Sequence, residues 1–152
     1  MSLREIINNE LKVAMLSKQK RDISTLRLVN AAIKDRDIEA RTSGEDGGVD
    51  DDTILSILSK MIKQRKESAE IYKASDRLDL SQQENEEIVI ISKFLPQQLS
   101  KEEISKICQE IVKNTNSSSI KDMGMCMGKI KDNYSSQMDF SIAGKIFKEI
   151  LT

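Results

Sequence analysis

The chain has 152 residues, of which 24 are basic and 25 acidic, and it contains no histidine. This length suits one compact domain or two small ones, and it allows folding without disulfides or a structural metal. The near-zero net charge gives no whole-chain signal for nucleic-acid binding. The absence of histidine excludes Ser-His, Cys-His and His-metal centres.

The first 41 residues predict two amphipathic helices. Apolar residues at helical spacing place the first helix over residues 2–17. After a polar turn, Asp22 is a suitable N-cap for a second helix with an apolar stripe that includes Leu26, Val29 and Ile33. Aromatic residues make up only 3% of the chain, which also favours helix over sheet.

An acidic loop precedes the third predicted helix. Residues 42–52 hold five acids, no base and three of the six glycines, and the last acids are well placed to cap a helix over 51–75. The acids do not have the spacing of a calcium loop, so no metal site is predicted. The third helix carries a basic run with Lys60, Lys63 and Arg65, which is either a solvated face or an edge that binds phosphate.

A fourth helix leads to Pro96, the clearest boundary in the chain. Ser81 and Glu84 predict a capping box at its start, although Asp79 allows a start one turn earlier. Because proline disfavours helix at the preceding residue, the helix should end by Leu95.

Three further helices are predicted after this boundary. Ser100 and Glu103 predict a capping box for the first of them, and Asp139 predicts the N-cap of the last. The middle helix carries apolar residues from Ile120 to Ile130.

These elements predict an all-α protein. A helical N-terminal domain of about four helices, 1–95, is joined to a compact three-helix C-terminal domain, 96–152. No segment has the pattern of a signal peptide, and no run approaches the roughly 20 apolar residues that span a bilayer. We therefore expect a protein of the cytoplasm, or of an organelle interior if a targeting segment was removed, with no membrane contact.

Two glycines, Gly124 and Gly128, lie one turn apart in the predicted middle helix. They do not form a phosphate loop, because three residues separate them instead of four and Ile130 stands where Ser or Thr would bind magnesium. Glycine inside a helix costs about 1 kcal/mol relative to alanine. The pair therefore requires a reason, which is either close packing of the last helix or the close approach of a partner backbone such as a nucleic acid.

The two cysteines differ in their sequence surroundings. Cys108 lies on an apolar stripe and is interpreted as core packing. Cys126 lies between two methionines near the glycines and is expected to be more exposed. Neither has a base or metal partner, so neither is predicted to act as a nucleophile.

Four segments resemble the GatB/YqeY family over essentially the whole chain: "RLVNAAIKDRDIEAR", "MIKQRKESAEIYKASDRLDL", "ENEEIVIISKFLPQQLSKEEI" and "DMGMCMGKI". The resemblance implies a free-standing YqeY-like protein, similar to the tail domain of the B subunit of the glutamyl-tRNA and aspartyl-tRNA amidotransferase. That domain is understood to help hold tRNA while other domains perform the amide chemistry. The family's glycine motif maps onto Asp122, Met123, Gly124, Met127 and Gly128, and its last capping acid onto Asp139. After Ile130 this sequence has fewer basic and glycine residues than the family pattern.

The resulting hypothesis is an RNA-binding module for tRNA or tRNA-charging machinery, with no catalytic residue, metal or cofactor of its own. Two alternatives stay open: a carbon–nitrogen ligase that uses glutamine as the amide donor, and a helical adaptor that binds other proteins. The predicted RNA surface consists of Lys121, Gly124, Gly128, Lys129, Lys131 and Lys145, with Lys60, Lys63 and Arg65 as a second edge.

Overall fold

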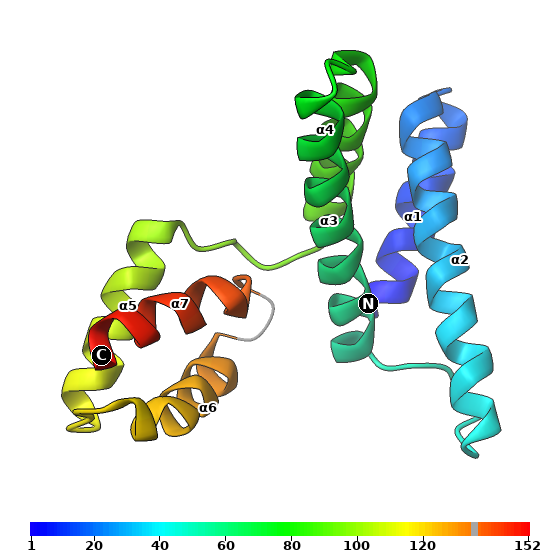
Figure 1. The fold of residues 1–152 in the computed structure, drawn as a ribbon. Helices are drawn as coiled ribbons and strands as arrows, with labels where there is room; N and C mark the ends of the chain where they lie inside the picture. Colours follow the sequence, from blue (N-terminus) through cyan, green and yellow to red (C-terminus); the bar gives the residue numbers. More distant parts are fainter. Residues whose placement is uncertain (135–136) are drawn as a thin grey trace. The chain divides into compact units, whose positions relative to one another are not determined.

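The computed structural model describes residues 1–134 and 137–152 (Figure 1). Within these ranges the chain forms seven α-helices and one short 3-10 helix, with no strand, which confirms the predicted all-α class. The chain divides into two compact units, Met1–Leu95 and Pro96–Thr152. The elements are α1 (Leu3–Leu16), α2 (Lys20–Thr42), α3 (Asp51–Ala74), α4 (Leu78–Ser92), α5 (Lys101–Asn114), η1 (Ile120–Asp122), α6 (Met123–Asn133) and α7 (Phe140–Leu151).

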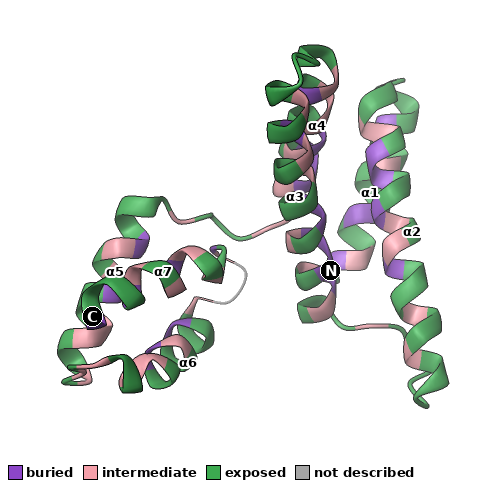
Figure 2. Cartoon of the chain, in the orientation of Figure 1, coloured by how far each residue is buried: buried purple, intermediate pink, exposed green. Residues whose placement is uncertain are grey.

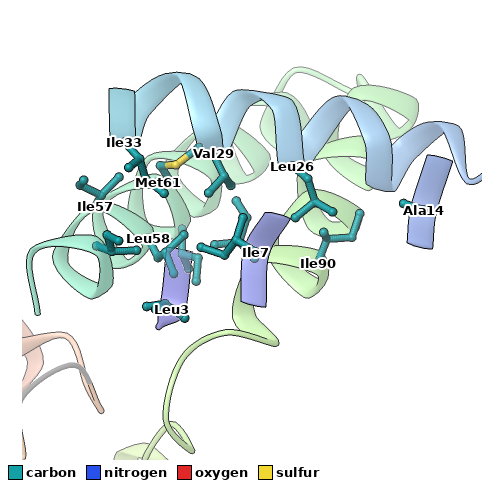
Figure 3. Close-up of a cluster of buried hydrophobic side chains, with 13 residues drawn as sticks. Leu3, Ile7, Ala14, Leu26, Val29, Ile33, Ile57, Leu58, Met61 and Ile90 are labelled. Carbon is teal, nitrogen blue, oxygen red and sulfur yellow. The ribbon is translucent and has the colours of Figure 1, made fainter. Parts of the chain in front are cut away.

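The N-terminal unit is built from four helices around one apolar core. α3 and α4 form its most extensive pair, and α2 packs against both α1 and α4. Figure 3 shows Ile7, Val29, Leu58 and Ile90 gathered from the four helices into one cluster, in which each side chain is buried. Because every helix contributes to the same core, the four helices stabilise one another.

Two helix starts differ from the sequence prediction. α2 begins at Lys20 with Gln19 as its N-cap, so Asp22 lies in the first turn, where its charge still favours the helix dipole. The capping box predicted at Ser81 is wrong, and the alternative start at Asp79 is correct to within one residue, because α4 begins at Leu78. The Ser81 hydroxyl donates a hydrogen bond to the carbonyl of Ala69 in α3 at 3.0 Å. Ser81 therefore joins two helices instead of starting one.

An arginine clamp fastens α1, α2 and the following loop together. Arg4 donates to both carboxylate oxygens of Asp37 at 2.8 and 2.9 Å, and the same carboxylate accepts from the backbone N–H of Val49 at 2.9 Å. The hydrogen bonds from Arg4, followed by that from Val49, hold the pKa of Asp37 below its usual value. Gly48, next to this contact, has a φ of +85°, a backbone conformation that glycine adopts without strain.

The C-terminal unit packs α5, α6 and α7 around a second core. Ile104, Cys108, Ile130 and Phe147 are almost completely buried there. The predicted caps at both ends are confirmed: Ser100 and Glu103 form the capping box of α5, and the Asp139 side chain accepts from the N–H of Ser141.

The start of the middle helix was predicted less well. Residues Ile120–Asp122 form a 3-10 turn before α6, and Ile120 is 47% exposed instead of lying on the buried stripe.

Candidate nucleic-acid interface

The glycines of α6 lie on its exposed side. A Cβ atom built on Gly124 or on Gly128 would have no heavy atom of the surrounding protein within 4 Å. Gly144 of α7 is the glycine that faces α6, since a Cβ there would lie 3.7 Å from Met123 Cε and 3.9 Å from Met127 Sδ. Close packing of the last helix therefore does not explain Gly124 and Gly128. Of the two reasons given above, the close approach of a partner backbone is the one that remains.

Helix geometry places one lysine in line with these glycines and one beside them. At about 100° of rotation per residue, Gly124, Gly128 and Lys131 fall within an arc of about 60° on α6. Lys129 is rotated by about 100° from Gly128 about the axis of α6, and the acidic residue Asp132 projects at an angle between Gly128 and Lys129. The exposed face of α6 is therefore smooth at the two glycines, with Lys131 on the same line and Lys129 on one side of it, beyond Asp132.

Two more predicted lysines lie on neighbouring elements. Lys121 is in η1, directly before α6, and Lys145 follows Gly144, the residue at which α7 meets α6. All four lysines are exposed, and among the described residues none of them takes part in an ion pair. Their charges are thus available to a partner.

Lys148 is a candidate that the sequence analysis missed. It is exposed and follows Gly144 by one helical turn, so it lies on the side of α7 that is turned toward α6. α7 also contacts η1, which carries Lys121. The sequence places Lys148 one turn after Gly144, but it does not show that Gly144 faces α6. For this reason Lys148 could not be identified from the sequence alone.

The second predicted edge, on α3, is smaller than expected. Lys60 and Lys63 are exposed. Arg65 lies against α4 instead, with its Nε 3.4 Å from Oε2 of Glu87 and its NH1 donating to the Met61 carbonyl at 3.2 Å. The side chains of Arg65 and Glu87 are only 14% and 9% exposed, so Arg65 is a structural residue and is not part of the proposed surface.

The cysteines form no reactive site. Cys126 is completely buried, so its expected exposure is wrong, and Cys108 is completely buried as well. Burial, with a smaller contribution from Cys126, raises the pKa of Cys108 to about 11. A thiol with this pKa is protonated at neutral pH and is a poor nucleophile.

Two acids at the start of α3 accept backbone N–H groups at the starts of helices. Asp50 is the N-cap and accepts from the N–H of Thr53, while Asp51 accepts from the N–H of Leu3 at 3.2 Å. Over residues 1–134 and 137–152, no three acidic or cysteine side chains gather in a way that could hold a metal ion. The helices described there include none with the length and apolar character needed to cross a membrane.

Comparison with known proteins shows which family this sequence matches. A sequence model described as "Yqey-like protein" matches residues 4–151. The chain is 35% identical over 89 residues to "Altered inheritance of mitochondria protein 41, mitochondrial" of Vanderwaltozyma polyspora, an alignment that covers 59% of this chain and 46% of that protein. It is 28% identical to the protein of the same name from Meyerozyma guilliermondii, over 95% of this chain and 77% of that protein. The chain thus spans about half the length of the first of these relatives.

Proposed function

Because the chain belongs to the Yqey-like protein family, we propose that it is a tRNA-binding module that acts with a tRNA-dependent amidotransferase or with other tRNA machinery and has no catalytic centre of its own. One observation carries this proposal: Gly124 and Gly128 leave an open stretch on α6 near exposed lysines that form no ion pair with any described residue. Since a Cβ at either glycine would meet no atom of its described neighbours within 4 Å, a partner that approaches the helix closely explains why glycines are present.

The chemistry of this face fits a phosphate backbone. Glycine removes the side chain that would hold a partner away from the helix, and lysines placed around it neutralise phosphate charge. None of the five aromatic side chains is exposed, so stacking on bases contributes little. Contacts of this kind fix the position of an RNA but do not read its sequence.

Binding of the purified protein to bulk tRNA at about 50 and 200 mM salt tests the proposal. Four lysine–phosphate contacts predict that affinity falls by about a hundredfold over this range, because each contact releases a counterion. Fluorescence anisotropy with labelled tRNA measures the loss. An absence of binding at 50 mM salt would contradict the proposal and favour a protein adaptor.

Replacing Gly124 and Gly128 together by alanine separates stability from binding. The added methyl groups meet open space, so we expect the double variant to gain about 1–2 kcal/mol in stability from helix propensity. The same methyl groups would hold an RNA backbone away, so tRNA affinity should fall. Thermal unfolding and tRNA titration measure the two effects.

Gly144→Ala is the matched control for the α6 glycines. Its Cβ would make ordinary contacts with Met123 and Met127 inside the unit, so it should leave tRNA affinity unchanged. A double variant at Gly124 and Gly128 that is more stable and binds tRNA as well as the wild type does would show that the glycines are not an approach site.

The compartment does not limit this proposal. The cytoplasm, which we propose on the basis of the sequence, contains tRNA, and so does the mitochondrion named for the two relatives. A glutamine-dependent ligase is less well supported, because the Cys108 and Cys126 thiols are buried.

A further inference from the structure

The outward side of α2 carries a row of four cations. Lys20, Arg27, Lys34 and Arg41 recur at every seventh residue, and all four are exposed. Seven residues advance a helix by about 10.5 Å and return it to within about 20° of the same direction. The four side chains, which we call the α2 row, therefore follow one nearly straight line about 30 Å long. Figure 2 shows exposed residues along the whole length of α2.

The cations of the α2 row differ from the other two on the same helix. Arg21 pairs with Glu86 at 3.3 Å and Arg36 with Glu39 at 3.6 Å. Within the described part of the chain, no member of the row has an ion pair or a side-chain hydrogen bond. Lys20, Arg27 and Lys34 thus keep their charges for a partner, while the charge of Arg41 also acts on Asp37.

The acids of α2 lie beside this line and not on it. Asp37 lies one turn before Arg41 and is bound to Arg4 and to the Val49 N–H, and the charge of Arg41 also helps to lower the pKa of Asp37. Asp35 and Glu39 lie about 80–120° round the helix from Arg27. The positions between the cations on the line itself are Ala31 and Ile38, so the charge along the row is of one sign.

We propose that the α2 row is a second RNA-binding surface that follows a phosphate backbone. This inference rests on the proposed function and assigns to it a surface in the N-terminal unit, separate from α6. Cations at even intervals complement a polyanion whose charges also repeat along its length, whereas a local acidic peptide would meet only one or two of them. A lipid surface is disfavoured, because the apolar face of α2 is already buried in the core and Ile38 alone adds a large apolar side chain to the row.

The test replaces all four residues by glutamine (Lys20→Gln, Arg27→Gln, Lys34→Gln and Arg41→Gln) in the full chain. Glutamine keeps helix propensity and removes the charge. The matched control replaces four other exposed lysines outside the α2 row, the α6 face and the α3 edge, Lys12→Gln, Lys73→Gln, Lys93→Gln and Lys106→Gln, with the same change in net charge. The affinity for bulk tRNA is measured across a salt series, and circular dichroism verifies folding.

In the row variant we expect the slope of log affinity against log salt to become shallower by about 3, because about four counterions are no longer released. The control should keep a slope within about 1 of the wild type. A row variant with the wild-type slope would overturn the inference. An equal loss of slope in the control variant would also overturn it. A third contradicting result would be that the row variant loses binding to anionic phospholipid vesicles or to polyglutamate but binds tRNA as the wild type does.

The two proposals fail in different ways. If the wild type does not bind tRNA at all, the proposed function is wrong and this inference falls with it. If the wild type binds, neutralising Lys129 and Lys131 weakens binding and the row variant behaves as the wild type, then only the second surface is wrong.

Discussion

Replacing Arg65 by methionine is expected to lower the free energy of unfolding of the N-terminal unit by about 3 kcal/mol or more. Arg65 of α3 and Glu87 of α4 are both mostly buried, and Nε of the arginine lies 3.4 Å from Oε2 of the carboxylate. Without the arginine, Glu87 becomes a buried charge with no opposite partner. Glu84 is close by, and its pKa is already raised by burial and by the charge of Glu87, which Arg65 partly offsets. The variant therefore loses the cation that compensates both acids.

Chemical unfolding of three variants at pH 7 measures this effect. Arg36→Met is the matched control, because its ion pair with Glu39 is exposed and such pairs contribute about 0–1 kcal/mol. A double variant, Arg65→Met with Glu87→Met, should recover much of the loss, since it removes the uncompensated charge as well. If Arg65→Met costs no more than Arg36→Met, the ion pair between α3 and α4 does not have the structural role assigned to it.

The second large effect concerns RNA. Replacing Lys129 and Lys131 together by glutamate should reduce tRNA affinity at about 0.1 M salt by at least a hundredfold, because two phosphate contacts become repulsions. Both side chains are exposed on α6, and glutamate has a helix propensity close to that of lysine. We therefore expect the variant to remain folded.

The control for this charge reversal lies in the same unit. Lys101 and Lys106 of α5 are also exposed, and their replacement by glutamate changes the net charge equally. Filter binding of labelled tRNA distinguishes the two variants, with circular dichroism to verify folding. Equal loss in both variants would mean that net charge, and not the α6 face, governs binding.

Local signals predicted the caps of α5 and α7 but not that of α2, where Gln19 and not Asp22 is the N-cap. Ser100 and Glu103 interact within one turn, so their spacing alone was sufficient to identify the start of α5. Ser81 has a similar sequence signal three residues before Glu84, but its hydroxyl bonds to Ala69 across the helix pair. A tertiary hydrogen bond of this kind cannot be read from neighbouring residues.

The candidate site also combines features that depend on a single helix with features that depend on how helices pack. Exposure of the lysines on α6 follows from the helical period, and it was predicted. Whether Gly124 and Gly144 face a neighbouring helix depends on how α6 and α7 pack, and here the two glycines differ. Arg65 lies in a basic run that reads as a solvated face, yet its partner Glu87 is 22 residues away in another helix. The α2 row has a period of seven that is visible in the sequence, but that period does not show that Arg21 and Arg36 on the same helix are paired with acids.

The clamp made by Arg4, Asp37 and Val49 also determines where the N-terminal unit tolerates a break in its chain. The exposed segment 43–47 joins α2 to α3, and a Cβ on Gly44 or Gly47 would meet no other atom within 4 Å. Such a segment is accessible to a protease or to an inserted sequence. Asp37 of α2 accepts from the N–H of Val49, two residues after this segment, so the two sides of the segment are held together independently of it. A chain cut in this segment would therefore remain assembled, and new termini or a fused domain could be introduced there without disturbing either core.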